Sequence, residues 1–286
     1  MGSTPSSYEL RIRPNRKWLR IGWKELWEYR DLLVLLVRRD LVSKYTQTIL
    51  GPLWFVVQPV LTTLTFTIVF GKMAKISTDS LPPTLFYLCG MLPWNYFANT
   101  YGATASTFSS NAGLFGKVYF PRLIVPLAAA ISNLFALAVQ FAVYILLYLY
   151  YSYCTTWIGT GGVSWNVFFL PLVIAQVGMV SLGLGLCMSA LSSKYKDFNH
   201  ISGFVLSILF YATPVIFPMS IIPAAWRWLA LLSPLSFTQE AFRFLLLGEG
   251  YVTLKGFIIS SIGTIGIFTL GILSFKKSER TFVDTV

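Results

Sequence analysis

Six long apolar segments follow one another along the chain, separated by short polar stretches. A helix needs about 20 apolar residues to cross the hydrocarbon core of a bilayer, where it must satisfy its own backbone hydrogen bonds. The segments are long enough for this, and the fifth is the shortest. The pattern therefore predicts an all-α integral membrane protein with transmembrane helices over residues 48–70, 85–108, 123–150, 168–192, 201–217 and 256–275.

The segment 23–47, which precedes the first span, predicts an amphipathic helix that does not cross the membrane. Its uninterrupted apolar run, residues 32–37, is only six residues long. Charged side chains lie largely opposite the apolar ones, so we expect the helix to lie in the headgroup interface. The alternative is a cytoplasmic helix that packs on a partner protein. The apolar face consists of Trp23, Leu26, Trp27, Leu33, Val37, Leu41 and Tyr45.

Two further short helices, 224–232 and 237–247, are expected between the fifth and sixth spans. Both are too short to cross the bilayer, so we expect a short re-entrant helix pair that dips into the external leaflet. Prolines break the chain before and between them at Pro218, Pro223 and Pro234.

The second of these helices has clear end signals. Ser236 and Gln239 have the spacing of a capping box, and Gly248 stands where a C-terminal glycine belongs. Glu240 and Arg243 are three residues apart, so they can form an ion pair on one helix face.

The distribution of Lys and Arg predicts the orientation. With an internal N-terminus, 17 of the 22 basic residues fall on the cytoplasmic side and 5 on the external side. Cytoplasmic loops retain such residues, so we expect both termini in the cytoplasm. The predicted organisation is a cytoplasmic tail (1–22), the interfacial helix (23–47), one six-span membrane domain (48–275) and a second tail (276–286).

Composition and charge exclude other classes of protein. The chain is 55% hydrophobic and 12% charged, and residues 123–193 contain no Asp, Glu, Lys or Arg, which excludes disorder and a soluble enzyme core. The net charge of +11 would suit nucleic acid. The basic residues, however, lie in short segments between apolar spans, where they anchor the topology. We therefore expect no nucleic-acid partner.

The predicted spans contain no Asp, Glu, Lys, Arg or His. Proton-coupled transport needs titratable groups at depth, so this argues against it, whereas backbone carbonyls and hydroxyls leave sodium binding open. The sequence lacks a G-x-x-x-x-G-K-[ST] loop, and no motif for a catalytic nucleophile or a metal site is evident. Three dispersed cysteines favour neither disulfides nor metal. Energy for uphill transport must then come from another polypeptide.

Several motifs resemble, in order, the type-2 ABC exporter permeases that carry O-antigen, capsular polysaccharide or teichoic acid. The similarity extends over about residues 30–282. The matching segments are RRDLVSKY (38–45), LGPLW (50–54), QP (58–59), NAGLFGKV with FPR (111–122), KDF with PVI (196–216) and SP through EAFR to Gly248 (233–248).

This resemblance implies a homodimer of six-span subunits, bound to two copies of a separate nucleotide-binding ATPase. ATP and Mg²⁺ would bind to that partner and no cofactor to this chain. The assembly would move a lipid-linked polysaccharide from the cytoplasmic to the external side of a bacterial inner membrane. Two rivals stay open: an exporter of another lipid or drug, and an intramembrane enzyme of glycan assembly, which would place carboxylates, His or Arg at a membrane cavity.

The resemblance also implies roles for cytoplasmic residues. The first cytoplasmic loop would contain a coupling helix that docks on the ATPase, with Ser110 or Asn111 as its cap; the alternative is a tight turn without a partner. Lys194, Asp197 and His200 would add a second contact or merely solvate a span end. The coupling residues are Asn111, Leu114, Phe115, Lys117 and Val118. The interfacial helix, lining the cytoplasmic approach, contributes Trp27, Arg38, Arg39, Asp40, Lys44 and Tyr45.

A candidate glycan channel follows from side chains that suit sugars, whose hydroxyls and C–H faces match polar groups and aromatic rings. On the first span, four such residues share one helix face: Trp54, Gln58, Thr62 and Thr65. The fifth span adds Ser207 and Tyr211, and the second adds Tyr87, Trp94, Phe97 and Tyr101. Helix packing and interfacial aromatic belts are the competing interpretation, which the sequence alone favours. To the external re-entrant segment we assign Trp226, Arg227, Glu240 and Arg243.

Overall fold

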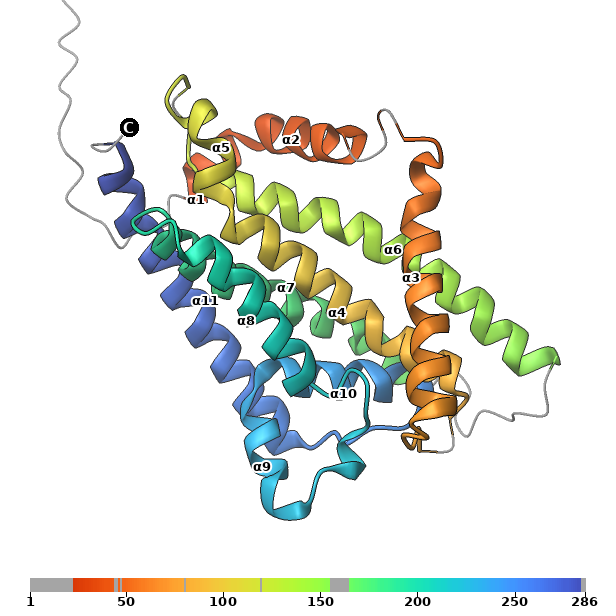
Figure 1. Cartoon of the computed structure of the whole chain (residues 1–286). Helices are drawn as coiled ribbons and strands as arrows, with labels where there is room; N and C mark the ends of the chain where they lie inside the picture. Colours follow the sequence, from red (N-terminus) through yellow and green to blue (C-terminus); the bar gives the residue numbers. More distant parts are fainter. Residues whose placement is uncertain are drawn as a thin grey trace, which may run out of the picture.

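The computed structural model describes residues 23–43, 46, 48–79, 81–118, 120–154 and 165–283, and within these ranges every regular element is a helix (Figure 1). Lys44 and Tyr45 of the expected interfacial helix lie outside the described residues. The long helices are α3 (Trp54–Phe66), α4 (Pro83–Ala105), α6 (Ile124–Cys154), α7 (Leu170–Ser192), α8 (Phe198–Ala212) and α11 (Leu254–Val283). The shorter helices are α1 (Trp23–Glu28), α2 (Arg30–Ser43), α5 (Thr107–Phe115), α9 (Ala224–Leu232) and α10 (Pro234–Leu247).

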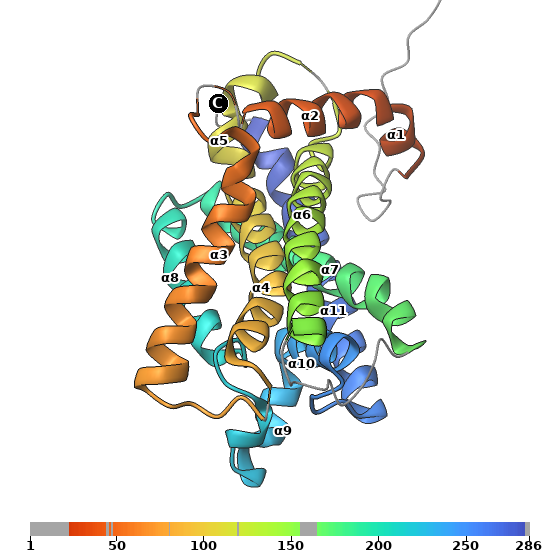
Figure 2. The same cartoon turned by 90° about the vertical axis from the view of Figure 1, so that its right-hand side faces the viewer.

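Helix α4 runs through the middle of the bundle. On one side of it lie α3 and α8, and on the other lie α7 and α11 (Figure 2). Most of its side chains are buried, from Leu85 to Ala105. By contrast, α8 buries none of its residues and α3 buries only Pro59 and Thr63. The molecule therefore has a tightly packed side and a sparsely covered side.

Within the part of the chain that the structure describes, four helical segments are long and apolar enough to cross a membrane: Trp54–Met73, Ile124–Cys154, Asn166–Ser192 and Leu254–Glu279. They correspond to the first, third, fourth and sixth expected spans. The first continues beyond α3 as a π-helix, Thr67–Met73. The sixth reaches further than expected, because α11 continues through the predicted cytoplasmic tail to Val283. Helix α8 contains only 15 residues.

Among the described residues, α7 and α11 make the most extensive helix–helix contact, and glycine allows their backbones to approach. A Cβ atom at Gly183 would lie 2.8 Å from the carbonyl oxygen of Ile267. A Cβ at Gly271 would in turn collide with the backbone of Gly183. Small residues let helix backbones approach closely in membranes, where dispersion contacts replace the hydrophobic effect as the driving force.

The described residues form two hydrophobic cores. The larger one joins α4, α7 and α10 around residues such as Phe86, Phe97 and Phe242. The smaller one lies at the end of the bundle that carries α2 and α5. It collects Leu36, Phe108, Phe115, Phe120, Ile124, Val125, Ala128, Leu186, Ile272 and Phe275.

The expected interfacial helix is divided into α1 and α2 at Tyr29. Leu26, Leu33 and Val37 of the predicted apolar face do pack against the smaller core. Trp27, by contrast, is 71% exposed, and Leu36, which the predicted face omitted, is buried. The residues that pack on this core, Leu26, Tyr29, Leu33 and Leu36, recur three or four positions apart, so one apolar stripe runs through both helices and Trp27 lies beside it.

Helix α9 occupies the predicted range 224–232, whereas α10 begins at Pro234, three residues before the expected start. The predicted capping box is wrong, because the N-cap is Ser233 and Gln239 instead donates a hydrogen bond to the carbonyl oxygen of Gly90 in α4. Gly248 ends the helix as expected, with a positive φ of 77°.

Candidate transport pathway and coupling surfaces

The polar and aromatic face predicted on the first span lies at the surface of the protomer. Trp54 is 47% exposed, Gln58 and Thr65 are exposed, and Thr62 is partly exposed. The contacts to neighbouring helices are made about 100° further around α3, through Pro59, Thr63 and Phe66. The predicted stripe is thus turned away from the rest of its own protomer.

Hydrogen bonding explains why these hydroxyls do not need a neighbouring helix. The Thr62 hydroxyl donates to the carbonyl oxygen of Gln58 at 2.9 Å, and Thr65 donates to Leu61 at 2.9 Å. Such bonds to the residue four positions earlier satisfy a hydroxyl within its own helix. These two hydroxyls therefore bond within α3 and not to a neighbouring helix.

The fifth span presents a similar face. Tyr211 is 69% exposed, Ser207 is exposed, and its hydroxyl donates to the carbonyl oxygen of Gly203 at 3.1 Å. Phe204, 67% exposed, shares this face, although it is not among the predicted channel residues. Phe204 lies three residues before Ser207 and seven before Tyr211, and this helical spacing could have indicated that it shares their face.

Aromatic contacts hold α3 and α8 next to each other. The rings of Phe66 and Phe210 are 5.9 Å apart, and Phe210 also lies 5.1 Å from Trp94 of α4. Both helices lie on the same side of α4 (Figure 2).

The aromatic residues of the second span do not lie on an exposed channel face, contrary to the prediction. Trp94 is 6% exposed, and Tyr87, Phe97 and Tyr101 are 2% exposed or less. They form the centre of the larger core together with Phe86. Within this protomer they are packing residues, as the competing interpretation held for them.

A helix, α5, is present where the coupling helix is predicted, and it begins at Thr107. Asn111 interrupts it with φ −117° and ψ 17°, so a second helical segment starts after Asn111, as predicted. The Asn111 amide donates back to the carbonyl oxygen of Thr107 at 3.0 Å. Lys117 is exposed and Val118 is 55% exposed just beyond the helix end.

The expected apolar knob is only partly available at the surface. Phe115 is 8% exposed, packed near Phe108 and Phe120, with the guanidinium of Arg122 5.2 Å from the centre of its ring. Leu114 is partly buried against the same core. Phe115 therefore anchors the loop in the core, and Val118 is the apolar residue of this loop that is exposed to a partner.

The same loop is tied to the end of α11. The Arg122 guanidinium donates to the carbonyl oxygen of Glu279 at 3.1 Å, and the ring of Phe108 stacks on that of Phe275 at 4.6 Å. The second group of expected contact residues, Lys194, Asp197 and His200, is exposed between α7 and α8. Both places are accessible to a partner protein.

The charged residues of α2 remain at the surface. Arg38 is exposed, and Arg39 donates to the carboxylate of Asp40 at 2.9 Å. Trp27 of α1 lies under the guanidinium of Arg30, which is 5.8 Å from the ring centre. These side chains could therefore meet headgroups or substrate, as expected of an interfacial helix.

The predicted Glu240–Arg243 ion pair is confirmed, and both side chains are buried within the protein. Both side chains are 2% exposed, and α10 lies against α4, α7 and α11. Arg243 also donates to the carbonyl oxygen of Pro214 at 2.9 Å and lies 4.0 Å from the ring centre of Phe86. Glu240 accepts the backbone N–H of Tyr251 at 3.0 Å. Sequence periodicity could not reveal these long-range partners.

The other two residues of the external segment behave differently. Trp226 is 62% exposed on α9. Arg227 donates to the carbonyl oxygen of Ile222 at 2.8 Å and to that of Ser220 at 3.0 Å. The Ser220 hydroxyl donates in turn to the carboxylate of Asp79, which links the loops after α8 and α3. This link was not predicted.

Comparison with known proteins matches residues 31–247 to the family model of the ABC-2 type transporter. The O-antigen export system permease protein of Myxococcus xanthus is 30% identical over 199 residues, or 70% of this chain and 73% of the relative. A protein of the same name from Klebsiella pneumoniae is 26% identical over 257 residues, 89% and 94% of the two chains. The polysialic acid transport protein of Escherichia coli is 24% identical over 252 residues, 86% and 93%. The chain belongs to the ABC-2 type transporter family.

Proposed function

We propose that this chain is the membrane-spanning permease subunit of an ATP-driven exporter that moves a lipid-linked polysaccharide from the cytoplasmic to the external side of a bacterial inner membrane. The relatives named above are O-antigen and polysialic acid export proteins and cover most of the chain. The observation that carries the proposal is the exposed face of α3, which presents Trp54, Gln58 and Thr65 on a helix apolar enough to span a bilayer.

Six crossings with both termini in the cytoplasm follow if α4 and α8 also span. Helix α4 has 23 residues without one charged side chain, and its moderate hydropathy suits a helix surrounded by protein rather than lipid. Helix α8 is short, but the chain after it stays buried from Thr213 to Ile216. In this topology α9 and α10 form the re-entrant pair at the external end.

A homodimer would give the exposed faces of α3 and α8 a function. In one protomer Gln58, Ser207 and Tyr211 face outward, where lipid would leave an amide without a hydrogen-bond partner. Pairing two protomers through this side would enclose a channel lined by amide, hydroxyl and aromatic groups. Such a lining can contact both the hydroxyls and the C–H faces of sugars.

The energy would come from two copies of a nucleotide-binding subunit, which hold ATP and Mg²⁺. Their docking place is the exposed surface around Lys117 and Val118, supplemented by Lys194, Asp197 and His200. Stoichiometric co-purification of an ATPase from the native membrane is expected. Export activity of the purified chain alone would contradict this part of the proposal.

The channel is tested by the separate substitutions Trp54→Ala, Gln58→Ala and Tyr211→Ala, with Leu64→Ala as the matched control. Leu64 is 46% exposed on α3 but lies to one side of the polar stripe. We expect surface polysaccharide to fall in the three variants and to persist in the control, while membrane insertion is equal in all four. Normal export by all three channel variants would refute the assignment.

A further inference from the structure

Arg122 connects the first cytoplasmic loop to the last helix of the chain. Helix α5, which opens this loop, and the C-terminal part of α11 lie at the same end of the bundle (Figure 1). The Arg122 guanidinium donates to the carbonyl oxygen of Glu279 at 3.1 Å, and the Arg122 backbone N–H donates to the Glu279 carboxylate at 3.5 Å. One residue of the loop therefore holds both the main chain and a side chain of α11.

The surroundings of Arg122 favour arginine at this position. The side chain is only 9% exposed, and its guanidinium also lies 5.2 Å from the ring centre of Phe115. Glu279 stands four residues before the last residue of α11, where the negative end of the helix dipole attracts a cation. A guanidinium can stack on a ring and donate to an oxygen at the same time. Arg122 therefore joins the aromatic core of the loop to α11.

Phe108 provides a second connection between the same two elements. Its ring stacks on that of Phe275 with the centroids 4.6 Å apart, and it also contacts Phe115 at 6.1 Å. Phe275 and Glu279 are about one helical turn apart on α11. Two contacts at this spacing fix both the position and the direction of the loop relative to α11.

From α11 the contacts continue to α7. The Ser278 hydroxyl, next to Glu279 in the chain, donates to the carbonyl oxygen of Ala190 at 3.1 Å. Further along the same pair, the two backbones approach closely at Gly183 and Gly271. A displacement of the loop would therefore move α11 and α7 together.

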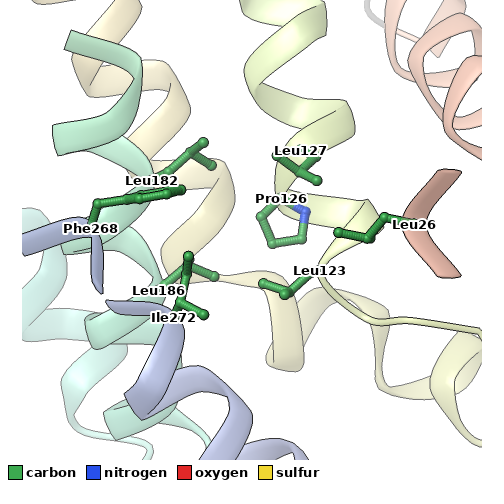
Figure 3. Close-up of a pocket in the computed structure, with 8 residues that line it drawn as sticks. All are labelled: Leu26, Leu123, Pro126, Leu127, Leu182, Leu186, Phe268 and Ile272. Atoms are coloured by element: carbon green, nitrogen blue, oxygen red, sulfur yellow. The ribbon is translucent and has the colours of Figure 1, made fainter. Parts of the chain in front are cut away.

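The apolar contact between the start of α6 and this helix pair is less complete. A cavity of about 30 Å³ lies between them, lined by Leu123 and Pro126 on the side of α6 and by Leu186 and Ile272 on the other side (Figure 3). Side chains next to an unfilled space lack part of their dispersion contacts. The connection from the loop to α7 and α11 is therefore concentrated in the polar and aromatic contacts described above.

We propose that Arg122 is a positioning residue that transmits the movement of the bound ATPase from the first cytoplasmic loop to the α7–α11 pair. The proposal rests on the proposed export function, in which the ATPase docks around Lys117 and Val118, a few residues before Arg122. Because Arg122 is mostly buried, it acts on α11 and not on the ATPase itself. Its loss should leave the ATPase bound and disconnect ATP hydrolysis from export.

The experiment compares Arg122→Gln with the unaltered chain, each purified with its ATPase from the native membrane. We expect the ATPase stoichiometry and the rate of ATP hydrolysis to be retained in the variant. Surface polysaccharide on the cells should fall about tenfold, the factor that corresponds to the loss of one charge-assisted hydrogen bond.

Two further variants serve as rescue and control. Arg122→Lys keeps the charge and a donor for the Glu279 carbonyl oxygen, so it should recover part of the export. The matched control is Lys277→Gln, which removes an exposed charge from the same end of α11 and should export normally.

The ratio of export to ATP hydrolysis distinguishes positioning from support of the fold. A purely structural role would lower ATPase binding, hydrolysis and export in parallel, and this result would overturn the proposal, as would normal export by Arg122→Gln. Arg122→Met, which keeps the packing against Phe115, is measured by the same criteria if Arg122→Gln does not assemble with the ATPase. Failure of both variants to assemble would refute the positioning role. Absence of an ATPase from the preparation of the unaltered chain would instead refute the export proposal, so the two failures can be told apart.

Discussion

At the scale of single residues, the most consequential feature is the buried pair of Glu240 and Arg243. A buried ion pair is costly to desolvate, and it persists where both partners find further hydrogen bonds. Here Arg243 reaches Pro214 at the end of α8, and Glu240 reaches Tyr251 before α11. The pair therefore fastens α10 to the chain on both sides of it.

Breaking this pair one partner at a time should destabilise the protein. We expect Glu240→Gln or Arg243→Gln each to cost about 3–5 kcal/mol, because the remaining charge is buried without its counter-ion. The double variant should lose less than the sum of the two single losses. Thermal unfolding of the four proteins in detergent measures this, and strict additivity would show that the two side chains act independently.

The exposed residues after α5 should affect partner binding without affecting the fold. Val118→Asp and Lys117→Glu place negative charge on a surface that is already exposed, so we expect weaker ATPase co-purification at unchanged thermal stability. Phe115→Ala should instead lower the thermal stability, by about 3–5 kcal/mol, because the ring is buried. If Val118→Asp retained full ATPase binding, the contact would lie elsewhere.

At the scale of elements, the contact between α7 and α11 depends on the absence of two side chains. We expect Gly271→Ala to destabilise the pair by about 1–3 kcal/mol, since its methyl group would meet the backbone of Gly183. Gly266→Ala on the same helix is the control, because a Cβ there has open space around it. The Gly266→Ala substitution should leave the stability unchanged or raise it by up to about 1 kcal/mol. Thermal stability in detergent compares them, and equal losses would contradict a specific role for Gly271.

The elements show where sequence patterns suffice and where they do not. Hydropathy located four of the expected spans, because bilayer thickness sets a minimum length for an apolar helix. It could not predict that α4 would be the centre of the bundle, since burial of Trp94 and Tyr101 by other helices leaves no mark in the local pattern. The predicted apolar face of the interfacial helix likewise included Trp27, which is exposed, and omitted Tyr29 and Leu36, which pack on the smaller core.

The candidate site could likewise be predicted only where it depends on the spacing of residues along one helix. The stripe from Trp54 to Thr65 follows from helical spacing, and the structure shows it exposed. The partners of Gln239 could not be predicted, because its contact with Gly90 joins residues 149 positions apart. A capping box depends only on local spacing, so a tertiary hydrogen bond can replace it without any signal in the sequence.

At the scale of the whole molecule, the helices on the two sides of α4 are held together by different kinds of contact. The α7–α11 side is held by close backbone contact and interhelical hydrogen bonds, such as that from Gln176 to Ser260 at 2.6 Å. The α3–α8 side is held mainly by aromatic rings. A transport cycle that moves helices would displace the sparsely packed side first, because fewer buried contacts resist its motion.

The proposed orientation of the molecule can be tested with its own cysteine. Cys154 is exposed at the end of α6, whereas Cys89 is buried in α4. Because α6 begins next to the basic cytoplasmic loop, its far end should face the outside. A membrane-impermeant maleimide should then label sealed spheroplasts through Cys154, and Cys154→Ser should abolish the label. Lys117→Cys in the Cys154→Ser background should react only after permeabilisation. Labelling of Lys117→Cys in sealed spheroplasts would show that the topology is the reverse of the proposed one. The proposed coupling surface would then face away from an intracellular ATPase.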